Sequence, residues 1–133
     1  MLRSRVLPVL LLPILLALMA FRQAPLVNPA PIAVTSKMSS AQVLKAVKMA
    51  LVHRGWTITS LKPGIVESSL NTRDHVARIE VDYNRHQVAI KYVGSSNLKY
   101  EMKNGTAYIH KNYLGWVENL SKDIQNNLLL LGD

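Results

Sequence analysis

The sequence predicts an α+β domain of two layers, in which an N-terminal and a long C-terminal helix pack on one face of a four-stranded antiparallel β-meander. Three observations support this fold class. Apolar residues recur with helical spacing soon after residue 40 and again near the carboxyl terminus. Between these stretches, alternating apolar and polar residues are separated by turn-forming residues. Two amphipathic helices and one half-buried sheet bury their apolar surfaces together when both helices cover the same face.

The first twenty residues are typical of a secretory signal peptide. Arg3 and Arg5 precede a leucine-rich run without charges, which extends over residues 6–21 and contains Pro8 and Pro13. A helix that spans a bilayer needs about 20 apolar residues, and internal proline disrupts a helix. We therefore predict that residues 1–20 direct export and are cleaved. An uncleaved signal anchor is the alternative, and it is the only way in which the sequence leads us to expect association with a membrane.

The remaining chain divides into a short tether and one domain. Residues 21–38 contain three prolines and are predicted to form an extended tether. Residues 39–133 form a single α+β domain. Cysteine is absent, which excludes disulfides, thiol catalysis, thiolate metal sites and acylation of a cysteine. The formal charge of +8 favours anionic partners, although basic residues scattered in this way also serve solubility.

The first helix is predicted from its end signals. Ser39 and Gln42 match a capping box at its start, and Gly55 follows Arg54 where a left-handed residue ends a helix. The apolar residues between these signals repeat at helical spacing: Val43, Leu44, Val47, Ala50 and Leu51.

Four strands are predicted next, over residues 56–61, 65–70, 75–83 and 87–93. Asn84 and Arg85 are predicted to form the loop of the last hairpin. Residues 98–106 are polar and predicted to be irregular. From Ala107 onward a helical stripe of apolar residues predicts the long second helix: Ile109, Tyr113, Trp116, Val117, Leu120, Ile124, Leu128 and Leu131.

Several short motifs together resemble a known family. They are Arg54-Gly55-Trp56, Pro63-Gly64-Ile65, Arg73-x-His75-x-Ala77, Tyr92-x-x-Ser95-x-Asn97-Leu98-x-Tyr100 and Ile109-His110-x-x-Tyr113-x-x-Trp116. Over residues 40–125 the chain resembles a family of small uncharacterised exported proteins of Gram-negative bacteria, which are of lipoprotein type. The resemblance implies an envelope location and an α+β fold with an antiparallel sheet, and it implies no activity. The chain departs from the lipoprotein pattern, because Ala20-Phe21 stands where those proteins carry a cysteine.

Aromatic and polar residues gather in the segment between the last strand and the last helix. They suggest a binding groove for a sugar polymer or a peptide, and the candidate ligand-binding residues are Tyr92, Asn97, Tyr100, Tyr108 and His110. A structural interpretation competes with this one, because Tyr113 and Trp116 lie on the apolar stripe of the last helix and Asn97 can bond the local backbone.

No catalytic or metal-binding pattern stands out. The four histidines lack the spacing of a zinc site, and no cofactor is predicted. We expect a non-catalytic periplasmic or cell-envelope module that binds a protein, a glycan or an anionic surface, and we do not expect a nucleic-acid partner. One alternative is a small periplasmic hydrolase using His110 with Ser95 or Ser96. The other is a structural subunit of an envelope complex.

Overall fold

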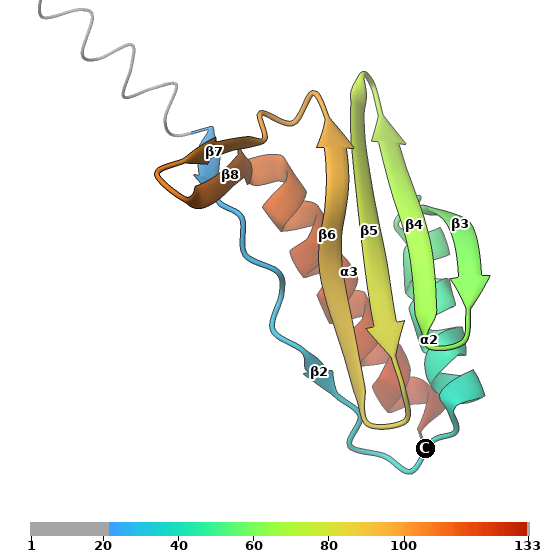
Figure 1. The fold of residues 1–133 in the computed structure, drawn as a ribbon. Helices are drawn as coiled ribbons and strands as arrows, with labels where there is room; N and C mark the ends of the chain where they lie inside the picture. The colour runs from blue at the N-terminus through green and yellow to red at the C-terminus, as the bar shows by residue number, and fades with distance from the viewer. Residues whose placement is uncertain (1–21, 133) are drawn as a thin grey trace, which may run out of the picture.

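The computed structural model describes residues 22–132. The predicted signal peptide, residues 1–20, lies outside the described residues. The protein is an α+β structure with two helices and two antiparallel sheets, as the sequence predicted in class (Figure 1). Within residues 22–132, neither helix combines the length and the apolar character that crossing a bilayer requires.

The larger sheet contains the predicted meander and one additional strand. Its strands β3 (Thr57–Lys62), β4 (Ile65–Thr72), β5 (His75–Tyr83) and β6 (Gln87–Ser96) follow one another in sequence order, and each pairs antiparallel with the next. A fifth strand, β2 (Ile32–Ala33), pairs with β6, so the order is β2-β6-β5-β4-β3. The alternation predicted for β5 is confirmed, because Ala77, Ile79 and Val81 are buried.

The β5–β6 hairpin is shifted from the predicted loop. The backbone amide of Asn84 donates to the carbonyl of Gln87 at 3.0 Å, so the two loop residues are Arg85 and His86 rather than Asn84 and Arg85. The side-chain oxygen of Asn84 accepts from the amides of His86 and Gln87 at 2.7 and 2.9 Å. This side-chain turn closes the hairpin just beyond Tyr83, the last residue of β5.

Residues 98–106 form regular structure where irregular structure was predicted. β7 (Glu101–Lys103) and β8 (Thr106–His110) form a hairpin, and β1 (Gln23–Pro25) pairs with the other edge of β8. Asn104 and Gly105 have φ values of 52° and 80°, which a two-residue hairpin turn requires. Hydrogen bonds to two flanking strands hold residues 107–110 extended, so the predicted helix begins four residues later than expected, at Lys111.

The predicted tether is packed onto the domain. Within this segment, β1 and β2 pair with β8 and β6, and Ile32 and Met38 are buried in the core. The pairing partners lie far away in the sequence, and the sequence pattern of this short proline-containing segment did not indicate them.

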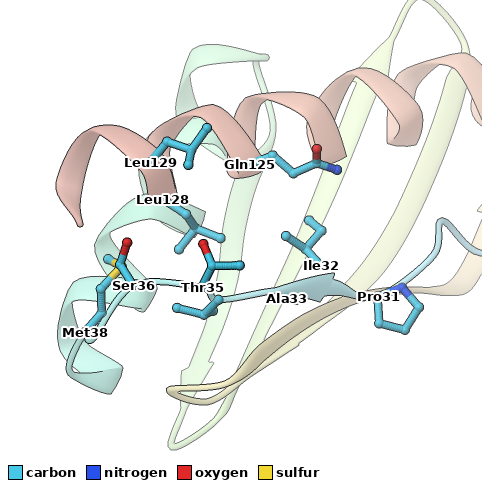
Figure 2. A pocket seen from close by; sticks show the side chains of 10 residues that line it. Pro31, Ile32, Ala33, Thr35, Ser36, Met38, Gln125, Leu128 and Leu129 are labelled. Carbon is cyan, nitrogen blue, oxygen red and sulfur yellow. The ribbon is translucent and has the colours of Figure 1, made fainter. Parts of the chain in front are cut away.

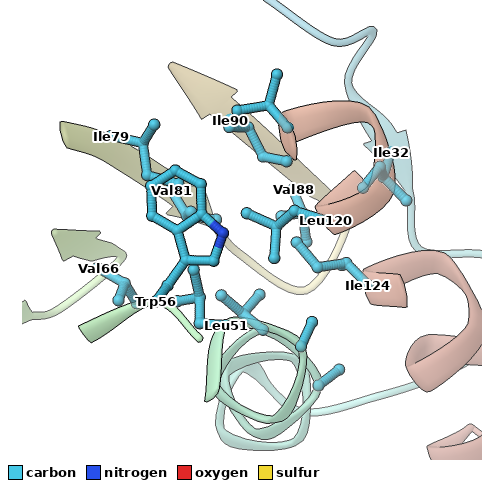
Figure 3. Close-up of a cluster of buried hydrophobic side chains, with 14 of the residues drawn as sticks. Ile32, Leu51, Trp56, Val66, Ile79, Val81, Val88, Ile90, Leu120 and Ile124 are labelled. Carbon is cyan, nitrogen blue, oxygen red and sulfur yellow. The ribbon is translucent and has the colours of Figure 1, made fainter. Parts of the chain in front are cut away.

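Both helices lie on the same face of the large sheet, and the core lies between the two layers (Figures 1 and 3). Helix α2 (Ser40–His53) begins at the predicted capping box, with Ser39 and Gln42 bonding each other's backbone, and it ends before Gly55, whose φ is 82°. Helix α3 (Lys111–Leu131) buries the predicted stripe against α2 and the sheet. The side chains that meet in the centre include Leu51, Trp56, Ile79, Val81, Ile90, Leu120 and Ile124.

Candidate functional site

The structure brings two of the predicted binding residues into direct contact. The rings of Tyr92 and Tyr100 stack at a centroid distance of 5.3 Å and an interplanar angle of 11°. Tyr92 also meets Tyr113 edge to face, at 5.5 Å and 86°. Tyr113 is 1% exposed and Tyr100 is 45% exposed, so the three rings extend from the core to the surface. Offset stacking and edge-to-face contact are the favoured arrangements of aromatic pairs, and they fix the orientation of the exposed ring.

The three tyrosine hydroxyls have different surroundings. The Tyr92 hydroxyl lies 2.7 Å from Ser95 Oγ, and that of Tyr100 donates to Met102 Sδ at 3.7 Å. The buried hydroxyl of Tyr113 has no hydrogen-bond partner among residues 22–132. Burial raises the pKa of Tyr113 well above its ordinary value, and nearby Tyr92 adds to the effect. Tyr113 therefore stays neutral and acts as a packing residue, in line with its place on the apolar stripe of α3.

Asn97 joins two chain segments at the same end of the sheet. Its φ is 58°, in the left-handed region that asparagine tolerates better than most residues. The Asn97 carbonyl accepts a hydrogen bond from His75 Nδ1 at 2.6 Å, and its side-chain amide reaches the Asp74 carbonyl at 3.5 Å. Asn97 and Lys99, whose φ is 55°, flank Leu98 and leave its side chain buried in the core. These contacts give Asn97 a role in holding the β4–β5 turn.

Tyr108 lies on the outer face of the small sheet. The Lys103 ammonium lies 5.3 Å from the centroid of its ring, within the range of a cation–π contact. Glu101, which pairs with Tyr108 across the sheet, lies 3.1 Å from the same ammonium. Gln23 of β1 donates to Glu101 at 2.8 Å and accepts from Lys103 at 3.3 Å. This polar network therefore includes β1, which the sequence placed in a tether.

His110 occupies the N-cap of α3. Its Nδ1 accepts from the backbone amide of Asn112 at 3.0 Å, which satisfies one of the amides that every helix start leaves open. Burial lowers the pKa of His110, and the positive charges of Lys99 and Arg22 lower it further. The lowered pKa favours the neutral ring, and the lone pair of Nδ1 already accepts the hydrogen bond from the Asn112 amide.

The contacts required for the alternative hydrolase are not formed in the described part of the chain. His110 makes no hydrogen bond with Ser95 or Ser96 there, and the Ser95 hydroxyl bonds Tyr92 instead. A nucleophile needs a base within hydrogen-bond reach.

No group of three or more histidine, aspartate or glutamate side chains in residues 22–132 is arranged to hold a metal ion.

The structure also contains a groove that sequence reasoning missed. Figure 2 shows it between the segment over residues 31–38 and the last turns of α3, with a volume of about 350 Å³. Ile32, Met38 and Leu128 form an apolar floor, and Thr35, Ser36 and Gln125 add polar groups. The short apolar run of Ile32, Ala33 and Val34 was the one signal of a strand here, and the nearby Pro29 and Pro31 obscured it.

Comparison of the chain with models of protein families, with curated proteins and with solved structures finds no match.

We call the end of the domain that carries most of these residues the tyrosine end. It comprises Arg22, β1, β7, β8, residues 92–100 and the first residue of α3. Four of the five predicted binding residues contribute side chains to its surface or to the layer below it: Tyr92, Tyr100, Tyr108 and His110. The fifth, Asn97, supports it from the β4–β5 turn.

Proposed function

We propose that this protein is an exported, non-catalytic binding module of the bacterial cell envelope, and that it binds its partner through the tyrosine end. The observation that carries the proposal is the Tyr92–Tyr100 stack, which holds one exposed aromatic ring in a fixed orientation. A binding group that is already ordered loses less conformational entropy when its partner binds. Tyrosine adds a large contact area with a polar tip.

The chemistry of the surrounding residues supports binding rather than turnover. The His110 lone pair caps α3, the Ser95 hydroxyl bonds Tyr92, and the Asn97 carbonyl accepts from His75. These polar groups therefore hold the structure together. The leucine-rich, uncharged run of residues 6–21 after Arg3 and Arg5 supports export.

Fractionation of cells tests export. We expect the protein in the periplasmic or envelope fraction, with an intact mass that begins at Phe21 if the signal is cleaved. A full-length chain held in the membrane fraction would identify an uncleaved anchor and would still be an exported protein. A cytoplasmic protein of full length would contradict the proposal.

Cross-linking tests the binding end. The sequence has no cysteine, so a single Met102→Cys variant carries one photoactivatable maleimide at the tyrosine end. Met102 is 59% exposed, and Leu61 of β3, at 52%, provides a matched position near the opposite end of the large sheet, because its partner Val66 pairs with Val81 of β5. We expect cross-linked products with isolated envelopes from position 102 and few from position 61. Equal yields from both positions would contradict the assignment of the binding end.

A further inference from the structure

The tyrosine end carries an excess of positive charge. Its cationic residues in the described chain are Arg22, Lys99, Lys103 and Lys111, and Glu101 is its carboxylate. The adjacent β4–β5 turn adds one charge of each sign, Arg73 and Asp74, and leaves the balance unchanged. Lys103 already contacts Glu101 at 3.1 Å. Burial is the main cause of the lowered pKa of His110, and Lys99 and Arg22 add to it, which agrees with a positive potential at this surface.

Charge alone does not distinguish this end from the other, because Lys62 and Arg85 are exposed at the far end of the sheet. Exposed apolar side chains do not either, since Leu61, Leu129 and Leu130 are exposed away from the tyrosine end. An exposed aromatic ring does, because Tyr100 is the one aromatic residue among the large apolar side chains that are exposed in residues 22–132. Tyr100 and Met102 are 45% and 59% exposed, and the Tyr100 hydroxyl bonds Met102 Sδ at 3.7 Å. Tyrosine is enriched at the boundary between lipid and water, where its ring is apolar and its hydroxyl hydrated.

The chain enters the described domain at the tyrosine end. Arg22 is the first described residue, and its carbonyl accepts from the backbone amide of Lys111, so the chain enters the domain at the tyrosine end (Figure 1). The residues before it include the uncharged, leucine-rich run of residues 6–21. A segment of that composition partitions toward lipid. During export, or if the segment stays attached as an uncleaved anchor, the membrane that it enters therefore faces the tyrosine end rather than the far end.

We propose that the tyrosine end docks on the headgroup region of an anionic phospholipid bilayer. Tyr100 and Met102 enter the interface, while Lys99 and Lys103 lie against the lipid phosphates. The β7–β8 hairpin is suited to this contact because its turn is only Asn104 and Gly105, so the apolar and basic side chains stand close to the tip. This partner assignment rests on the proposed function, since it takes the tyrosine end as the binding end of an exported protein.

Fluorescence quenching in vesicles tests the proposal. The full-length chain, labelled with an environment-sensitive fluorophore at Met102→Cys, is reconstituted into phosphatidylcholine vesicles and into vesicles of equal parts phosphatidylcholine and phosphatidylglycerol. Both contain a nitroxide-labelled lipid as quencher. We expect strong quenching at position 102 only in the anionic vesicles, and no such dependence at Leu61→Cys. Equal quenching in both vesicles, or quenching of position 61 instead, would overturn the proposal.

Two matched charge variants separate a specific surface from a general charge effect. Lys99→Gln with Lys103→Gln should weaken the docking equilibrium about thirtyfold, from a roughly fivefold loss for each basic residue near an anionic surface. Lys62→Gln with Arg85→Gln removes the same charge from the far end and should leave docking unchanged. Both pairs are exposed, and far-UV circular dichroism checks that each variant folds. Equal weakening by the two pairs would overturn the proposal.

Failure of this inference is distinguishable from failure of the proposed function. If position 102 cross-links in envelopes but is not quenched in anionic vesicles, the tyrosine end binds a protein or a glycan, and the lipid assignment is wrong. If cell fractionation places the protein in the cytoplasm, the proposed function is wrong whatever the vesicles show.

Discussion

Tyr92 and Tyr113, whose rings are in contact, allow two equivalent substitutions to be compared. We expect the two substitutions to change the stability of the protein in opposite directions. Tyr113→Phe removes a hydroxyl that is buried and has no hydrogen-bond partner among residues 22–132. Burying a polar group without a partner costs about 1–3 kcal/mol, so we expect this variant to be more stable than the wild type by about 1 kcal/mol or more. Tyr92→Phe removes a hydroxyl that is 2.7 Å from Ser95 Oγ. Its loss should destabilise the protein by about 1 kcal/mol.

The assay is equilibrium unfolding in urea, followed by tryptophan fluorescence. Each substitution removes a single oxygen atom and leaves the surface exposed on unfolding almost unchanged, so the slope of the transition should stay constant and its midpoint should report the change. A change of 1 kcal/mol corresponds to about 4 °C in Tm for a domain of this size. If Tyr113→Phe lowers the midpoint as much as Tyr92→Phe does, the Tyr113 hydroxyl has a partner and the reasoning is refuted.

Three further substitutions probe the fold. Ser39→Ala removes the hydroxyl that accepts from the Gln42 amide at 3.2 Å and should cost about 1 kcal/mol in urea unfolding, whereas an unchanged midpoint would show that the cap adds nothing. Leu120→Ala, at a fully buried position, should cost about 2–5 kcal/mol; a smaller loss would place Leu120 outside the tightly packed core. Arg54→Gln removes the two hydrogen bonds, 2.6 and 3.1 Å long, that lower the pKa of Asp123. A lowered carboxyl pKa adds stability above the unfolded value of about 3.9, which is lost as the pH falls through the folded value. The Tm difference between variant and wild type should therefore be full near pH 7 and shrink below about pH 3.9, as calorimetry would measure; a difference independent of pH would contradict this.

Elements with a strong local pattern were predicted correctly. The capping box at Ser39 and the glycine at position 55 bound α2 as predicted. The alternation along β5 and the stripe along α3 identified the buried faces of both elements. In each case the information lies within a few residues of chain, because helix and strand periodicities depend on neighbours at fixed short spacings. The candidate residues Tyr92 and Tyr100 were recognised from composition, but nothing in the sequence indicated that their rings stack.

What the sequence determined by itself, therefore, is the α+β class, both helices and the strands of the meander, since local spacing and turn residues specify them. Only the tertiary structure decided that residues 23–25 pair with β8, that residues 32–33 extend the large sheet, and that residues 106–110 form a strand rather than the start of a helix. These strands are too short to be specified by their own residues. Hydrogen bonds to distant partners stabilise them, and those same pairings build the tyrosine end and the groove beside α3.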